Sequence, residues 1–476
     1  MKTRLHSTGP FQRMAVAALV AGTLAACSPA QRPEPLLSQV TAPSGWRDGI
    51  TGEQTIDAQW WHGFGDPALN TLVGAALSRN TDILEATTRV DEARALLQAA
   101  HAARQPAINA VLGAQAGHAL GATGPTTTRA VQPELQASWE VDLWGRLRQQ
   151  ERVSTLQYQA SQVERDGAML GVAAATVQAY VGLLALDAQL AITRDTVKSR
   201  EEALRLAKDQ ARLGYTSQLQ LTQAQAEYQA VLGAIPQLEL ALRRQENGLR
   251  LLVGEMPGAV TRTGRLQQFR TPPFAVALPS ELLGRRPDIV QAELLLAASN
   301  ASLASRRAEF LPQVALKASL GSLFVNGLDY DPVSLWSIGG SVLAPIFSAG
   351  RITAQVDAAT ARRDRAAFAY RRTVLAAFGE VENALTAVSR LEEQMVHVRQ
   401  RRDILARTLG FARDRYESGY AAYLEVLDAQ RNLYQTELDE IALRQSQANN
   451  MVALYRALGG GWSASGFAAA PPGVIR

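Results

Sequence analysis

The side chains that could perform chemistry are few in this sequence and lie far apart. His62, His101, His118 and His397 stand singly, without the spacing of a metal site. No set of serine, histidine and aspartate with a nucleophile turn occurs. The stretch GFGDP at 63–67 contains a Gly-x-Gly, but it lacks a preceding strand and the third glycine of a nucleotide-binding loop. The sequence therefore gives no support for an enzyme, and we expect no cofactor and no metal.

Two charged groups of residues have simpler structural explanations. In GFGDP, Asp66 is expected to cap a helix that begins at Pro67. In RRPD at 285–288, Asp288 is expected to cap or brace the start of a helix, with Arg285 and Arg286 in ion pairs nearby. A catalytic or anion-binding cluster is the alternative for RRPD.

The single cysteine, Cys27, follows a segment typical of an exported protein. Positively charged residues precede the apolar run MAVAALVAGTLAA, which ends in small residues directly before Cys27. This arrangement resembles a bacterial lipoprotein signal, which implies removal of residues 1–26 and attachment of lipid (palmitate) to Cys27. An ordinary secretory signal is the alternative. Residue 28 is Ser, so the Asp that retains many such lipoproteins at the inner membrane is missing.

The bulk composition excludes several classes of protein. The chain has 476 residues, of which 47% are hydrophobic and 19% are charged, so a disordered protein is excluded. The net charge is +4 and no Lys/Arg run resembles a nucleic-acid-binding tail. We find no apolar run of about 18 residues after Cys27, so a membrane-spanning helix is not expected. Any part that spans a membrane would have to be a closed β-barrel.

The chain is a tandem duplication. Residues 207–254 align with 412–459 without gaps, and NTDILEATTRV at 80–90 aligns with RPDIVQAELLL at 286–296. The predicted organisation is therefore a signal peptide (1–26), an N-terminal lipid-anchored segment (27–77), repeat 1 (78–270), repeat 2 (271–459) and a C-terminal tail (460–476).

Each repeat is predicted to contain the same elements in the same order. A helix precedes a β-hairpin, and a long helix, a Gly-Tyr turn and a return helix follow it. In repeat 1 the helix is 78–104, the hairpin 106–143 has strands 106–116 and 131–143, and the helical hairpin 146–252 has helices 146–212 and 217–252. In repeat 2 the helix is 284–310, the hairpin 312–347 has strands 312–323 and 334–347, and the helical hairpin 351–457 has helices 351–417 and 422–457. Pro236 is expected to bend the first return helix.

The stretch VQPELQASWEVDL at 131–143 alternates apolar and polar residues without a break. Its odd positions, including Trp139 near the middle, form one face, and its even positions form a polar face. The other predicted strands alternate in the same way. A tilted membrane strand needs about 9–11 residues. Four strands cannot close a barrel alone, because about eight is the minimum, so the chain would have to oligomerise.

Several motifs in family order resemble the outer membrane factor family, the TolC-type exit ducts of tripartite efflux pumps. They are WWHGFGDPALNTLVGAAL at 60–77, LLGRRPDIVQAE at 282–293, FLPQVAL at 310–316, PIFSAGR at 345–351 and YLEVLDAQ at 423–430. The resemblance covers nearly the whole chain after the signal segment. Together with the lipoprotein signal, it points to the lipidated drug-efflux branch.

The resemblance implies a mainly α protein with a membrane β-barrel. Three copies of four strands would form one twelve-stranded barrel in the outer membrane, continuous with a long periplasmic α-barrel. The odd residues of 131–143 would then face lipid, and Gln132, Glu134, Gln136, Glu140 and Asp142 would line the lumen. The implied activity is passive export of drugs or other small toxic compounds. The implied partners are a periplasmic adaptor protein, an inner-membrane transporter, expected to be proton-driven, and outer-membrane lipid; nucleic acid is not expected.

The resemblance also assigns functional positions. Turns at the periplasmic tips are expected to contact the adaptor through Arg212, Gly214, Tyr215, Ser217, Glu417, Ser418, Gly419 and Tyr420. Glu425 and Asp428 match the acidic rings of the periplasmic gate and lie three residues apart, on one helix face. Ala421 stands at a position that is acidic in the lipidated branch, which favours a looser gate. Solvated helix charges are the alternative for Glu425 and Asp428.

Two other functions are compatible with parts of the sequence. The same architecture serves type I protein secretion in some members of the family. A lipid-anchored periplasmic coiled-coil scaffold would need the long helices but not four membrane-length alternating strands. The substrate range and the identity of the transporter and adaptor are not encoded in a readable motif.

Overall fold

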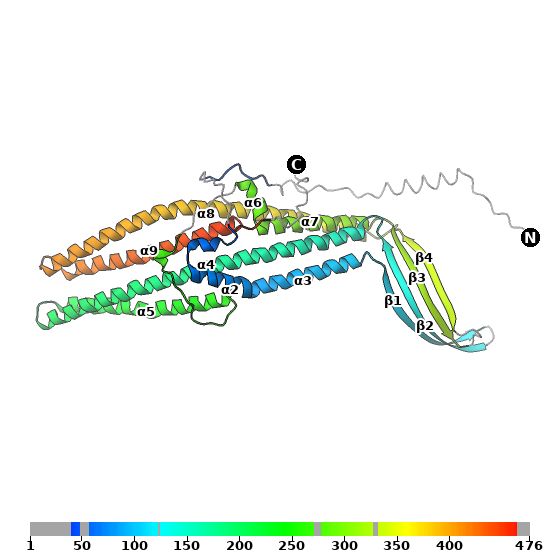
Figure 1. Cartoon of the computed structure of the whole chain (residues 1–476), viewed down its shortest axis with the longest axis horizontal. Coiled ribbons are helices and arrows are strands. Elements are labelled where there is room, and N and C mark those ends of the chain that lie inside the picture. Colours follow the sequence, from blue (N-terminus) through cyan, green and yellow to red (C-terminus); the bar gives the residue numbers. More distant parts are fainter. Residues whose placement is uncertain (1–39, 48–56, 122–123, 271–277, 327–331, 464–476) are drawn as a thin grey trace, which may run out of the picture. The chain divides into compact units, whose positions relative to one another are not determined.

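The computed structural model describes residues 40–47, 57–121, 124–270, 278–326 and 332–463 (Figure 1). Cys27 and the predicted signal peptide lie outside these residues, as does the tail from residue 464. The described chain forms two compact units. One contains Asp91–Ala160 and Ala292–Arg371; the other contains Val40–Val90, Ser161–Gln291 and the chain from Arg372. Each unit therefore combines corresponding parts of the two sequence repeats.

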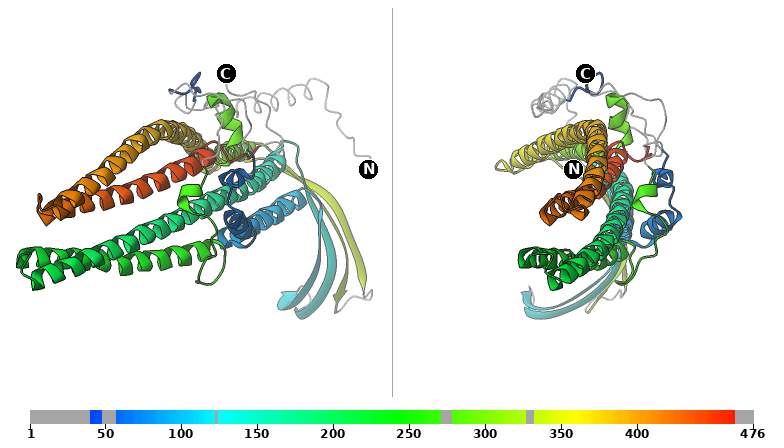
Figure 2. Two further views of the ribbon diagram at one scale, coloured as in Figure 1. Left: turned by 60° about the vertical axis from the view of Figure 1, so that its left-hand side comes forward. Right: turned by 90° about the vertical axis from the view of Figure 1, so that its left-hand side faces the viewer.

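The first unit contains a four-stranded antiparallel sheet in the order β1-β2-β3-β4. The strands are β1 (Ala107–Gly121), β2 (Gly124–Val141), β3 (Gln313–Val325) and β4 (Val333–Leu343). Figure 2 shows them as one curved layer. The hairpins of the two repeats join through β2 and β3. Within the described residues, the outer edges of β1 and β4 have no strand beside them.

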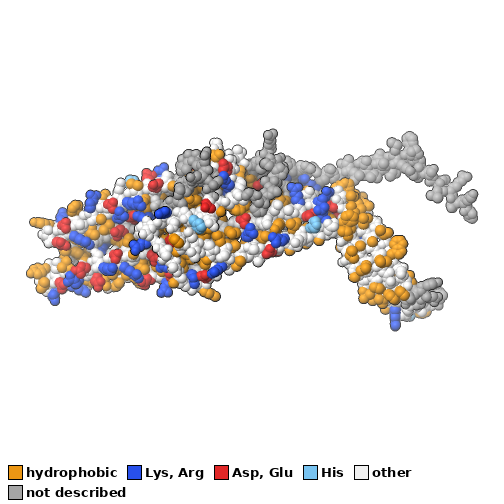
Figure 3. Space-filling view, viewed as in Figure 1, with side chains coloured by type: hydrophobic (Ala, Val, Ile, Leu, Met, Phe, Trp, Pro, Cys, Tyr) orange, Lys and Arg blue, Asp and Glu red, His pale blue; other side chains and the backbone are white. Residues whose placement is uncertain are grey.

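The strand register separates apolar from polar side chains, as the alternation predicted. Leu135 lies opposite Ala110 on β1 and Leu320 on β3, and Leu320 lies opposite Trp336 on β4. The neighbouring row is polar: Gln136 lies between Asn109 and Ser319, whose hydroxyl is 2.9 Å from that of Ser337. Because side chains alternate between faces, the apolar rows share one face of the sheet. Figure 3 shows hydrophobic side chains over the face of the sheet in view.

Three strand boundaries differ from the prediction by four residues or more. The segment expected as a long loop, 117–130, is mostly paired strand, since β1 extends to Gly121 and β2 begins at Gly124. Threonines at 126–128 favour this extended pairing. Trp139 consequently lies two residues before the end of β2 and not near its middle, and its indole donates to the Arg104 carbonyl at 2.8 Å. Strand β4 ends at Leu343, because Pro345 has no N–H for the ladder.

Two long helices and two return helices dominate the rest of the chain. Helices α4 (Arg146–Arg212) and α8 (Arg351–Glu417) have 67 residues each and the bounds that the sequence predicts. At 1.5 Å per residue each is about 100 Å long. The return helices α5 (Gln218–Leu252) and α9 (Tyr423–Ala457) have 35 residues each, and α5 continues through Pro236.

Helix α4 contains an apolar segment that the sequence reading did not expect. By length and composition, an 18-residue window of this helix would suffice to cross a membrane. However, 61% of that window is buried within the fold. In α4, the side chains of Val177, Tyr180, Val181 and Leu183 are fully buried. Such burial is typical of the core helix of a helical bundle.

Two helices precede each hairpin, and the predicted helices 78–104 and 284–310 begin three residues later than expected. Helices α2 (Pro67–Arg79) and α3 (Thr81–Ala102) are separated at Asn80, and α6 (Pro279–Arg285) and α7 (Pro287–Ala308) at Arg286. The side chain of Asn80 accepts from the N–H groups of Asp82 and Ile83, which caps α3. Pro287 lacks an N–H and restricts Arg286 to extended backbone, which ends α6. Short 3-10 helices, η2 (Trp60–Phe64) and η3 (Leu266–Gln268), lie in the connecting segments.

The predicted structural roles of the charged motifs are confirmed. Asp66 caps α2 by accepting from the Ala68 N–H at 2.9 Å, and its other oxygen accepts from the buried Tyr180 hydroxyl at 2.7 Å. In the RRPD segment, Arg286 pairs with Asp288 at 2.7 Å and with Glu380 at 2.8 Å, while Arg285 pairs with Glu281 at 2.7 Å. These contacts hold helix ends in place.

Each helix break anchors the end of the return helix of its own repeat. Asn80 donates to the carbonyl of Leu252 at 2.9 Å, and Arg286 donates to that of Ala457 at 3.1 Å. The glycine that follows each return helix, Gly254 or Gly459, has a left-handed φ, +73° and +90° respectively. A Cβ at these positions would lie 2.3 Å from the Arg79 carbonyl oxygen and 2.0 Å from that of Arg285. The backbone contact therefore requires glycine in both repeats.

We expect Gly459→Ala to destabilise the protein by about 2–5 kcal/mol, from the left-handed φ and the clash with the Arg285 backbone. Thermal unfolding of the purified protein in detergent, followed by circular dichroism, measures this as a lower midpoint. Gly74→Ala, in α2 where a Cβ meets nothing within 4 Å, is the matched control and should not lower the midpoint. Equal midpoints for the two variants would contradict the anchoring role.

Candidate functional site

The two turns that join the long helices to the return helices have the same geometry. Gly214 and Gly419 both have φ +78°. The N–H of the tyrosine that follows each glycine donates back to the long helix, Tyr215 to Gln210 at 2.9 Å and Tyr420 to Arg415 at 2.8 Å. A left-handed glycine followed by such a bond is the Schellman end of a helix. Figure 2 shows both turns at the same end of the second unit.

All the residues predicted at these tips are exposed. They are Arg212, Gly214, Tyr215 and Ser217 in the first turn, and Glu417, Ser418, Gly419 and Tyr420 in the second. The tyrosines are 81% exposed, although tyrosine carries a large apolar ring. Leu213 and Leu219 add exposed apolar surface beside them. The tips therefore present an accessible surface of mixed character.

An apolar cluster directly behind the tips joins the two helical hairpins. Its central residue is Leu427 on α9, which is fully buried. The remaining members come from four helices: Leu204 and Ala207 of α4, Ala224 of α5, Ala412 of α8, and Tyr423, Val426 and Ala429 of α9. The rings of Tyr416 and Tyr423 lie 5.4 Å apart at its edge. Burial of this cluster couples the positions of the two tips.

The structure gives each predicted gate acid an arginine neighbour in the same chain. Glu425 lies in the first turn of α9, with a carboxylate oxygen 3.8 Å from Nε of Arg415. Asp428 lies one turn further on, 3.6 Å from Arg431. Both carboxylates are more than half exposed, so these ion pairs are loose and screened by solvent. Arg431 follows Asp428 by three residues, a spacing that could have been read from the sequence; the pairing of Arg415 across the turn could not.

Arg431 extends into a buried polar network that the sequence did not reveal. Its Nε donates to Glu227 on α5 at 2.9 Å, which holds the pKa of that carboxyl below its ordinary range. Glu227 is also 3.9 Å from Arg200 on α4, and Arg200 donates to the side-chain oxygen of Gln430. Burial lowers the pKa of Arg200. The network connects α4, α5 and α9 directly behind the tips.

On the sheet, the predicted polar row has one correction. Glu134 accepts from Gln136 at 3.2 Å, and Glu140 forms a two-pronged ion pair with Arg146. Asp142, however, lies beyond the end of β2. Its carboxylate accepts from the N–H of Leu147 at 3.1 Å and that of Arg148 at 2.9 Å, so it caps α4 and does not belong to the strand row.

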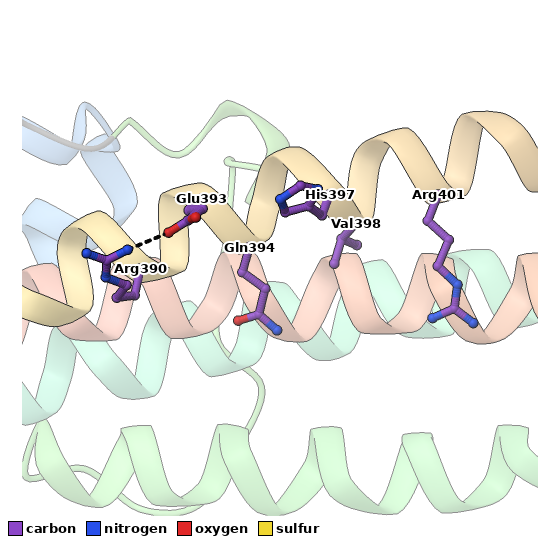
Figure 4. A pocket seen from close by; sticks show the side chains of 6 residues that line it. All are labelled: Arg390, Glu393, Gln394, His397, Val398 and Arg401. Carbon is purple, nitrogen blue, oxygen red and sulfur yellow. Dashed lines mark hydrogen bonds and ion pairs between the residues drawn. The ribbon is translucent and has the colours of Figure 1, made fainter.

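No cluster typical of catalysis occurs in the described part of the chain. Among the described residues, no group of three His, Cys, Asp or Glu side chains could hold a metal ion. A hollow of about 470 Å³ lies along α8 and contains His397 (Figure 4). All its lining residues belong to that one helix: Arg390, Glu393, Gln394, His397, Val398 and Arg401. Arg390 and Glu393 pair with each other at 2.7 Å, and no carboxylate of the described residues is paired with His397 in the way that a catalytic base requires.

The lowered pKa of Glu227 makes the tip network sensitive to acid. The ion pair stabilises the fold above the ordinary carboxyl pKa of 4.5, and this stability is lost as the pH falls through the lower folded-state pKa. We expect Glu227→Gln to lower the thermal midpoint at pH 7, and the difference from wild type to shrink as the pH falls from about 4.5 through the lower folded-state pKa of Glu227. Glu202→Gln, in an exposed pair with Arg205, should change the midpoint little at any pH. A Glu227→Gln deficit that persists at low pH would contradict the ion-pair role.

Comparison with known proteins agrees with this architecture. The family model for outer membrane efflux protein matches residues 72–255 and 278–460. The pyoverdine export outer membrane protein OpmQ of Pseudomonas aeruginosa is 33% identical over 451 residues, covering 92% of this chain and 95% of its own. The cation efflux system protein CusC of Escherichia coli K12 is 32% identical, covering 85% and 89%. The solved outer-membrane channel OprN is 27% identical with a TM-score of 0.81, covering 91% of this chain and 98% of its own. The chain belongs to the outer membrane efflux protein family.

Proposed function

We propose that three copies of this chain form a passive outer-membrane duct for the efflux of small toxic compounds. The observation that carries the proposal is the sheet, which has an apolar face, a polar face and two edges that no strand of the described chain pairs with. In hydrocarbon, backbone groups cannot bond to water, so each unpaired group costs several kcal/mol and open sheet edges do not occur. Pairing of β4 in one copy with β1 of the next satisfies both edges.

Three copies supply three times four strands, twelve in all, which exceeds the minimum of about eight for a barrel. The apolar face, with Leu135, Leu320, Trp336 and Ile338, would face lipid. The polar face would line a water-filled lumen. A lipid on Cys27 would anchor each chain in the same membrane. A scaffold without a pore leaves this sheet unexplained.

Helix α8 supports assembly with further copies. It exposes a row of large apolar side chains at spacings of seven or eight residues, Val396, Ile404 and Phe411, which are 50%, 53% and 68% exposed. Leu375, three heptads before Val396, is 51% exposed. A heptad row of this kind is typical of a helix that packs against another helix. We assign its partner to a helix of the neighbouring copy.

The tips would form the periplasmic entrance. Three-fold symmetry would bring Glu425 and Asp428 of each copy together as acidic rings that attract cations. Arg415 and Arg431 lie beside these acids in each chain, in loose ion pairs, and Ala421 adds no third acidic ring. An adaptor protein would bind the exposed tip residues and favour the open state. A proton-driven inner-membrane transporter would supply the energy.

The relatives are named for pyoverdine export and cation efflux, so the cargo of this chain would be small and chosen by the transporter.

Phe411→Glu should prevent assembly, because the charge would be buried without a partner at a cost of ~3 kcal/mol or more per contact. Size-exclusion chromatography with light scattering in detergent would report the number of copies, three for wild type and fewer for the variant. Leu213→Glu introduces the same change at an exposed position in the tip turn and should leave the trimer intact. A trimeric Phe411→Glu variant would rule out this α8 row as a contact between copies.

Single-channel recording in planar bilayers tests the duct and its gate. Wild type should conduct, with a preference for cations. The double variant Glu425→Ala/Asp428→Ala should conduct with that preference reduced several-fold, because the acidic rings are gone. Glu201→Ala/Glu202→Ala removes the same charge from α4 and serves as the control. Failure of wild type and variant alike to conduct would refute the duct; an unchanged preference in the gate variant would refute only the gate assignment.

A further inference from the structure

A cavity of about 230 Å³ lies between α4, α8 and α9, behind the tip cluster. Its walls include Arg200 and Ser199 of α4, Arg413 of α8 and Gln430 of α9. Leu409 and Leu433 add apolar wall. Nothing in the duct function described above uses this cavity.

Arg200 is buried in this cavity wall without full hydrogen bonding. Its side chain is 3% exposed, and its Nε has no hydrogen-bond partner among the described residues. One guanidinium N–H donates to Gln430, which is uncharged. The nearest carboxylate, Glu227, is 3.9 Å away and already accepts from Arg431. Burial of a guanidinium group destabilises the fold when its only nearby carboxylate is 3.9 Å away and also pairs with another arginine. An additional anion beside Arg200 would reduce this destabilisation.

The charges around the basic end of the cavity do not balance. Two guanidinium groups line this end, those of Arg200 and Arg413. A third, that of Arg431, lies beside it and pairs with the two nearby carboxylates, Glu227 and Asp428. Three positive charges less two negative charges leave one positive charge. Arg413 has no carboxylate within ion-pair distance in the described chain, and its contact is the Ser199 hydroxyl at 3.4 Å. Arginine and hydroxyl donors around one surplus charge suit an oxyanion.

Two acidic residues also line the cavity, but at its other end. Asp195 precedes Arg200 by five residues, about 7.5 Å along α4, and is paired with Lys198 at 3.2 Å. Glu437 follows Gln430 by seven residues, about 10.5 Å along α9. Burial raises the pKa of Glu437. In the described chain, neither carboxylate lies within ion-pair distance of Arg200 or Arg413.

We propose that the basic end of this cavity binds a small oxyanion of the phosphate or sulfate class. Arg200 and Arg413 would donate to its oxygens, and the Ser199 hydroxyl would supply a further donor. Because Arg200 lies on α4 and Arg413 on α8, the bound anion would link the two helical hairpins behind their tips. The proposal does not depend on conduction and concerns each chain by itself.

Isothermal titration calorimetry on the purified full chain in detergent, in chloride buffer of fixed ionic strength, tests the site with inorganic phosphate and with sulfate. We expect one anion per chain and a thermal midpoint that rises with phosphate concentration. Arg200→Gln and Arg413→Gln should each weaken binding at least 10-fold and abolish the rise. Acetate, with one carboxylate, should bind more weakly than phosphate.

Arg205→Gln is the matched control, because this arginine lies on α4 but is 65% exposed and pairs with Glu202. It should bind phosphate as wild type does. Arg413→Gln alters an exposed residue, so it tests the site even if Arg200→Gln fails to fold, which circular dichroism would reveal. No phosphate binding by wild type, full binding by Arg413→Gln, or equal loss in Arg205→Gln would overturn the proposal.

Discussion

The structure depends most on the unpaired outer edges of β1 and β4. A four-stranded sheet with an apolar face and a polar face satisfies its inner backbone groups, but its edges remain open within the described chain. Water can satisfy such edges in solution, and hydrocarbon cannot. The length of the strands, their alternation and the need for further copies all follow from placing this sheet in a membrane. The exposed apolar row on α8 likewise needs a partner from another copy, in this case a helix that covers it.

The duplication explains how one chain builds a nearly symmetric helical unit. Both repeats use a left-handed glycine at the tip and another after the return helix. The two repeats differ in their charged residues. Asn80 in repeat 1 corresponds to Arg286 in repeat 2, and both anchor a return helix. Glu425 and Asp428 correspond to Gln220 and Gln223, so only repeat 2 has acidic side chains at these two positions of the return helix. The two repeats therefore share a backbone arrangement but differ in the charged side chains that it carries.

The sequence predicted the parts that depend on local patterns. The bounds of α4 and α8 were predictable because apolar spacing and glycine turns mark helix ends locally. The two faces of the sheet were predictable because alternate residues of a strand lie on opposite faces. Once one residue is assigned to the apolar face, the faces of all the others follow. The starts of α3 and α7 were predicted three residues too early, because the apolar pattern does not mark Asn80 and Arg286 as the residues at which the helices are interrupted. The pairing of Glu227 with Arg431 was missed because the two residues are 204 positions apart and meet only after packing.

Hydrogen–deuterium exchange of the protein in lipid vesicles, resolved for each strand, tests the central claim most directly. If copies close the sheet into a barrel, the amides of β1 and β4 will be protected as strongly as those of β2 and β3. If the sheet remains open, the outward-pointing amides of β1 and β4 will exchange rapidly while β2 and β3 stay protected. Rapid exchange at both edges in vesicles would contradict the closed barrel and the duct that depends on it.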